Sequence, residues 1–64
     1  MKKTEYVLFT HSNEYVVEYL LKQLVLSKSI TEALTFDDFY VAMGFKDLLL
    51  KDCKLDCSVN TYIQ

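Results

Sequence analysis

Apolar residues fill almost the whole circumference of the helix that the pattern predicts for residues 12–28. At about 100° per residue, one broad face of this helix holds Val16, Val17, Leu20, Leu21 and Leu24. A second face holds Tyr15, Tyr19 and Leu26, and the charged strip holds Glu14, Glu18 and Lys22. Ser12 is a suitable N-cap, and the run Ser27, Lys28, Ser29 indicates the end of the helix. A helix of this profile is buried on most sides, so we expect it to need a partner surface.

Two strands are predicted at the ends of the chain. Residues 3–10 combine β-branched and aromatic side chains, with apolar groups on both faces. Residues 55–64 alternate strictly, because Leu55, Cys57, Val59 and Ile63 point to one side and polar residues to the other. We expect the two strands to pair.

The middle of the chain allows two interpretations. Residues 29–34 have no clear pattern. From Thr35, a capping-box sequence predicts a helix that ends at Gly44, the single glycine. Residues 39–45 also alternate, which would fit a strand, but the cap and the glycine favour the helix. Residues 46–54 form a short helical or turn segment with three adjacent leucines, at least one of which should be exposed.

Together these elements predict an α+β fold. Its small sheet has two or three strands, with the N- and C-terminal strands paired, and is packed by one long helix, with one or two short helices between. The 64 residues form a single small interaction domain, residues 1–64. A domain of this size buries about 60% of the surface that its unfolded chain exposes. With 52% hydrophobic residues, the chain therefore carries apolar side chains that its own core cannot take up.

Charge argues against several classes of partner. The net charge is −2, and the seven basic residues are all lysines scattered along the chain, so nucleic-acid binding is disfavoured. The acidic excess is too small for a DNA mimic. The helix predicted at residues 12–28 is too short and too charged to cross a membrane. There is no secretory signal, and with two cysteines we expect free thiols and a cytoplasmic protein.

Few residues carry reactive or metal-binding side chains, namely His11, Cys53, Cys57 and the pairs Asp37–Asp38 and Asp52–Asp56. One histidine and two cysteines are too few for a tetrahedral zinc site. The first aspartate pair is explained by a helix N-terminus and the second by a solvated turn. We therefore expect no catalytic residue, no bound metal and no cofactor, and the protein is not expected to be an enzyme.

Residues 36–54 have the outline of a helix-turn-helix with its turn at Gly44, which gives a dimeric DNA-binding regulator as one alternative. The outline departs from the motif at Tyr40, where a small residue is usual. The second helix would also be apolar and acidic, and would lack the side chains that read bases.

The sequence favours a non-enzymatic protein–protein interaction module. Lys-, Tyr- and Asn-rich usage without arginine, proline or tryptophan is common in phage and mobile-element genes, so we expect a small regulator or inhibitor that binds and occludes a host protein. Aromatic and leucine side chains are typical interface anchors. The candidate partner-binding residues are Tyr15, Tyr19, Leu48, Leu49 and Tyr62. A second copy of the chain is the other expected partner, and a homo-oligomeric accessory protein is a further alternative.

Overall fold

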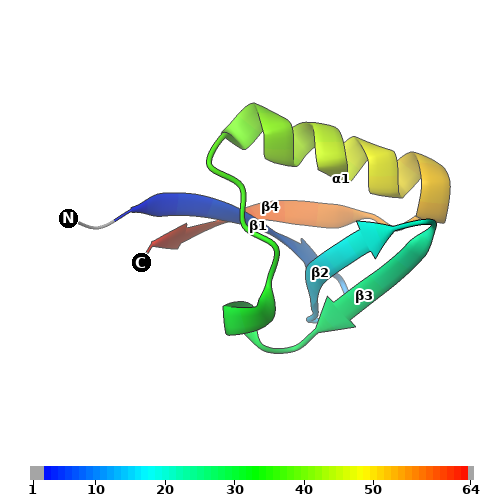
Figure 1. The fold of residues 1–64 in the computed structure, drawn as a ribbon, viewed down its shortest axis with the longest axis horizontal. Helices are drawn as coiled ribbons and strands as arrows, with labels where there is room; N and C mark the ends of the chain where they lie inside the picture. Colours follow the sequence, from blue (N-terminus) through cyan, green and yellow to red (C-terminus); the bar gives the residue numbers. More distant parts are fainter. Residues whose placement is uncertain (1–2, 64) are drawn as a thin grey trace.

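An antiparallel sheet and one long helix make up the fold in the computed structural model, which describes residues 3–63 (Figure 1). The strands are β1 (Thr4–Thr10), β2 (Tyr15–Leu20), β3 (Gln23–Ser27) and β4 (Cys57–Ile63), in the spatial order β3-β2-β1-β4. Helix α1 (Phe39–Cys53) covers one face, and the 3-10 turn η1 (Ile30–Glu32) lies on the other side of the sheet. The predicted α+β class is confirmed, with a sheet of four strands.

The predicted pairing of the two terminal strands is confirmed. β1 and β4 run antiparallel in an unbroken register from Thr4 opposite Ile63 to Thr10 opposite Cys57. Leu8 and Val59 lie opposite each other on the side of the sheet that α1 covers, where Leu8 is fully buried. Alternation along both strands therefore supplies half of the core from the chain ends.

The helix predicted for residues 12–28 is wrong, because this segment is the β2–β3 hairpin. Ser12 does not cap a helix. Its hydroxyl lies 2.8 Å from that of Thr10 and donates to the Glu14 carboxylate at 2.9 Å, within the β1–β2 turn. Asn13 takes a left-handed backbone conformation there, with φ 63°. Valine and tyrosine favour the half-buried strands of this hairpin, and an almost wholly apolar run satisfies the strand period as well as the helical one.

β1 and β2 separate soon after their turn, and the chain after η1 fills the gap. The single register pair between the two strands is Phe9 with Tyr15. Further along, Tyr6 exchanges two backbone hydrogen bonds of 2.9 Å with Phe36, and the Leu34 N–H donates to the Val16 carbonyl at 2.9 Å. Residues 34–36 thus satisfy backbone groups that the divergence of the two strands would leave unpaired.

Helix α1 begins at Phe39, where the Asp38 carboxylate accepts a 2.7 Å hydrogen bond from the Tyr40 N–H. The predicted start at Thr35 and end at Gly44 are both wrong, as is the separate short segment at residues 46–54, because one helix runs through to Cys53. Gly44 has no positive φ, and its position faces open space. The helix tolerates this glycine because the packing of its buried face outweighs a propensity deficit of about 1 kcal/mol.

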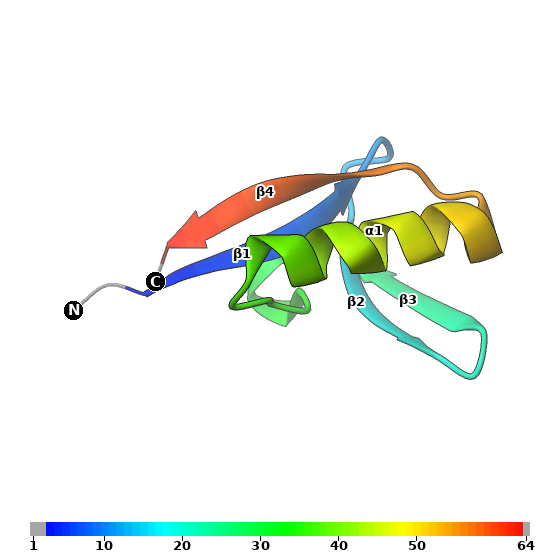
Figure 2. The same cartoon turned by 90° about the horizontal axis from the view of Figure 1, so that it is seen from above.

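The core lies between α1 and the sheet. Its buried members come from every part of the chain and are Leu8, Val16, Phe36, Ala42, Leu49 and Cys57. Tyr19 and Leu24 of the hairpin pack against this cluster, so one face of the hairpin is turned toward α1. The hairpin itself extends away from the β1–β4 pair, as Figure 2 shows.

Candidate interaction surfaces

Leu21 stands at the apex of the β2–β3 hairpin. Leu20 pairs with Gln23, so the loop between the strands contains just Leu21 and Lys22. Both loop residues have positive φ, 52° and 61°, as a type I′ turn requires. The Leu21 side chain is 88% exposed and that of Leu20 is 62% exposed.

This turn is chemically unusual. Type I′ turns are normally built from Asn-Gly or similar pairs, because a Cβ atom strains the left-handed conformation by roughly 1–2 kcal/mol per residue. Leu21 has neither the short polar side chain nor the missing Cβ that relieves this strain. A bulky apolar residue that is both strained and exposed contributes little to folding, which makes it a candidate for function.

Three exposed apolar side chains of the hairpin form what we call the hairpin patch: Leu20, Leu21 and Val25. Leu20 and Val25 lie on one face of the hairpin, as diagonal neighbours across β2 and β3. Tyr19 and Leu24 alternate with them and face α1 instead. The hairpin is therefore apolar on both faces, although the fold covers just one of them.

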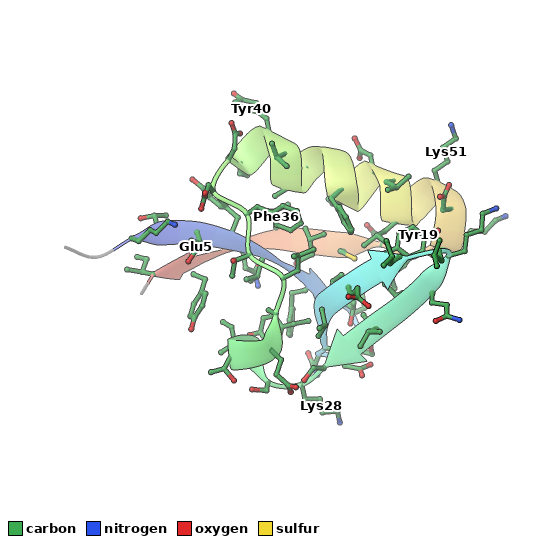
Figure 3. The ribbon with its side chains drawn as sticks, in the orientation of Figure 1. Glu5, Tyr19, Lys28, Phe36, Tyr40 and Lys51 are labelled. Carbon is green, nitrogen blue, oxygen red and sulfur yellow. The ribbon has the colours of Figure 1, made fainter. Side chains whose placement is uncertain are left out.

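Tyr19 fastens the hairpin to the end of α1. Its hydroxyl donates to the Asp52 carboxylate at 3.2 Å, and in Figure 3 its side chain lies beneath the last turn of the helix, near Lys51. Desolvation, a hydrogen bond with the Cys53 thiol and the negative charge of Asp52 together raise the pKa of Tyr19 to about 12. The phenol therefore remains a donor across the physiological pH range.

Helix α1 exposes apolar residues as well. Its first seven residues, FYVAMGF, carry no charge, and Tyr40 projects away from the sheet at 82% exposure (Figure 3). Val41 and Leu48 are separated by two turns and share one flank, at 58% and 41% exposure. These residues are dispersed along the helix, whereas those of the hairpin patch are adjacent.

The structure divides the five predicted contact residues among different surroundings. Leu49 is wrong as a contact residue, because it is fully buried in the core. Leu48 is exposed on the helix, and Tyr19 is half-buried against it. Tyr15 and Tyr62 are half-buried on the opposite face of the sheet, where the Tyr15 ring packs 4.9 Å from that of Phe9. The helical projection placed Tyr15 and Tyr19 together, but in the bulged strand they point to opposite faces.

The residues with reactive side chains do not assemble into a catalytic or metal site. His11 and Lys46 instead flank the Asp56 carboxylate, at 3.4 Å and 3.5 Å. Hydrogen bonds from His11 and then from Lys46 lower the pKa of Asp56. Both cysteines are free, and burial raises the pKa of Cys57, which leaves its thiol unreactive. Among residues 3–63, no three metal-ligating side chains come together.

Other predicted alternatives also meet the geometry. The continuous helix α1 lacks the turn at Gly44 that the helix-turn-helix outline needs. Within the described part of the chain, no pocket is found, and no helix has the length and apolar character to span a membrane. What the residues 3–63 do offer is apolar surface, gathered most densely at the hairpin.

No protein-family model, curated protein or solved structure matches this chain. The geometry of its surfaces is thus the basis for assigning a function. Sequence reasoning missed the hairpin patch because it placed Leu20, Leu21 and Val25 in a buried helix. One signal was available, since the polar pair Lys22–Gln23 interrupts two runs of strand-forming residues.

Proposed function

We propose that the protein is a non-enzymatic interaction module whose hairpin patch binds an apolar site on another protein. The observation that carries this proposal is Leu21, a large apolar side chain that is 88% exposed at the apex of a strained turn. Neither the strain nor the exposure stabilises the fold. Contact with a partner would use both, because a leucine on a rigid two-stranded ribbon can enter a pocket with little loss of conformational entropy.

The surroundings of the patch indicate the kind of partner. Glu18 and Lys22 lie beside it with opposite charges, so the rim presents no strong field of one sign. Binding would then depend on apolar burial more than on charge steering, and its affinity should change little with salt. We propose that the partner is a protein of a host cell, in line with the phage-like residue usage, and that the protein acts by occluding the surface it covers.

Crosslinking from the hairpin tip tests this function. A photoreactive amino acid at Leu21 should crosslink one defined protein in a host-cell lysate, and the same amino acid at Tyr40 should not. Both positions are exposed, at 88% and 82%, but they lie at different ends of the molecule. The matched comparison therefore separates a specific contact from general stickiness.

A double substitution supplies the second arm. Leu21→Asn with Lys22→Gly gives the turn its preferred residues, so the fold should be stabilised by about 1–2 kcal/mol. The same variant removes the apolar apex, so affinity for the crosslinked protein should fall by at least about tenfold. A better-folded variant cannot lose binding through unfolding. Equal binding by this variant and the wild type, in isothermal titration with the purified partner, would reject the hairpin patch.

A further inference from the structure

The outer edge of β4 has unpaired backbone groups. Tyr6 directs its N–H and carbonyl to Phe36, away from β4, so Tyr6 and Thr61 form a non-hydrogen-bonded pair. The backbone groups of Thr61 therefore point to the outer edge of the sheet. By alternation, those of Cys57, Val59 and Ile63 do the same, and no strand among residues 3–63 lies beyond them.

β4 lacks the devices by which edge strands avoid pairing. Its sequence CSVNTYI contains no charged residue and no proline, and its register with β1 has no bulge. The opposite edge, β3, is shorter, is flanked by Lys22 and Lys28, and pairs with β2 through a register shift between Val16 and Glu18. One edge of the sheet is thus protected, and the other is a seven-residue template for a further strand.

Exposed apolar side chains lie at both ends of this edge. Ile63, at the end of β4, is 59% exposed. Leu50 is 46% exposed on α1, one turn after Lys46, which contacts Asp56 at 3.5 Å just before β4 begins. Leu50 and Ile63 are therefore near opposite ends of β4. Antiparallel addition of an identical strand would bring the Ile63 end of one copy to the Leu50 end of the other.

We propose that a second copy of this chain docks along β4 and extends the sheet to eight strands. In the central register, Val59 lies opposite Thr61 of the second copy, and Asn60 lies on the two-fold axis opposite its own counterpart. Each of the four outward residues of β4 then exchanges backbone hydrogen bonds with the other copy. The axis is perpendicular to the sheet, so both helices lie on one face, and each Ile63 is covered by Leu50 of the second copy.

Self-complementarity favours a second copy over an unrelated chain. Two-fold pairing brings every side chain close to its own counterpart or to a residue of the same strand, which is unfavourable for charged strands. β4 is uncharged, so it meets itself without repulsion. The two exposed apolar residues at its ends also complement each other through the two-fold axis and no other operation.

Substitution of Thr61 tests the edge directly. Thr61→Pro removes an N–H that points outward, so pairing with β1 is retained while pairing with a second copy is lost. Thr61→Val is the matched control, because it keeps the N–H and the β-branched shape. We expect sedimentation equilibrium to show a wild-type dimer, an equal dimer for Thr61→Val, and a dissociation constant at least about tenfold higher for Thr61→Pro. Circular dichroism confirms that each variant folds.

A disulfide test fixes the register. Asn60→Cys places two thiols across the axis in a non-hydrogen-bonded pair, where Cα atoms are about 4.5 Å apart and a disulfide fits. Ser58→Cys, on the same face of β4, is the control, because its counterpart lies four residues away along the other strand. Oxidation should give a covalent dimer for Asn60→Cys and far less for Ser58→Cys on a non-reducing gel.

Three results would overturn the proposal. They are a wild-type protein that stays monomeric up to about 1 mM, a folded Thr61→Pro variant that dimerises as tightly as Thr61→Val, and equal crosslinking of the two cysteine variants. None of these measurements involves the hairpin patch, so the two proposals stand or fall separately.

Discussion

The Tyr19 hydroxyl and the Asp52 carboxylate lie 3.2 Å apart and join the β2–β3 hairpin to the last turn of α1. They are separated by 33 residues in the chain. Few contacts link the hairpin to the rest of the sheet, since β1 and β2 share one register pair. The Tyr19–Asp52 hydrogen bond therefore helps to set the position of the hairpin relative to the helix.

Alkaline pH should weaken this connection. The folded pKa of Tyr19 is about 12, and that of a free tyrosine is about 10, so the folded protein holds a proton that the unfolded chain releases. The contribution of Tyr19 to stability is thus fully present below about pH 10 and is lost as the pH rises toward 12. Thermal melts of Tyr19→Phe should lose less stability over this range than those of the wild type.

The buried Cys57 thiol also has a raised pKa and contributes its own loss of stability at alkaline pH. Because Tyr19→Phe retains Cys57, the difference between the two pH profiles belongs to Tyr19. Phenolate absorbance of the wild type minus that of Tyr19→Phe gives the titration of the one tyrosine. A midpoint near 10 would show that the hydroxyl is not held by Asp52.

Adjacent leucines of α1 should respond very differently to truncation. Leu49→Ala opens a cavity in the core and should lower the free energy of unfolding by about 2–5 kcal/mol. Leu48→Ala removes a 41% exposed side chain and should lower it by less than about 1 kcal/mol. Urea denaturation measures both. Similar losses for the two variants would mean that the helix faces the sheet in another rotation.

Gly44 should be improvable. A Cβ atom at this position meets no atom within 4 Å, and the backbone is helical. Gly44→Ala should therefore raise the free energy of unfolding by about 0.5–1 kcal/mol, and Gly44→Ser by less, in the order of helix propensity. Thermal or urea unfolding gives the ranking. Loss of stability in Gly44→Ala would show that the outer face of α1 is already occupied.

The terminal strands were predictable because their alternation is unambiguous. Leu55, Cys57 and Val59 share a side in the sequence pattern, and Cys57 and Val59 indeed pack on the core. The hairpin was not predictable in this way. In residues 15–26 apolar side chains occupy positions that suit both a strand and a helix, and the turn lacks the glycine or asparagine that usually marks a hairpin.

The helix was divided in the prediction because a lone glycine resembles a terminator. Gly44 ends a helix only when its φ is positive, and that depends on packing far along the chain. The same limit applies to the contact residues. Leu48 and Leu49 differ in burial only because α1 has one particular rotation over the sheet, and sequence reasoning that broke the helix at Gly44 could not fix that rotation.

The strand order β3-β2-β1-β4 has a consequence for valency. The hairpin and β4 occupy opposite edges of one sheet, so occupation of either surface leaves the other accessible. A dimer joined along β4 would carry two hairpin patches at its two outer ends, at a fixed separation. Such a particle would bind a target with two matching sites bivalently, and its residence time would then exceed that of a single hairpin without any additional contact.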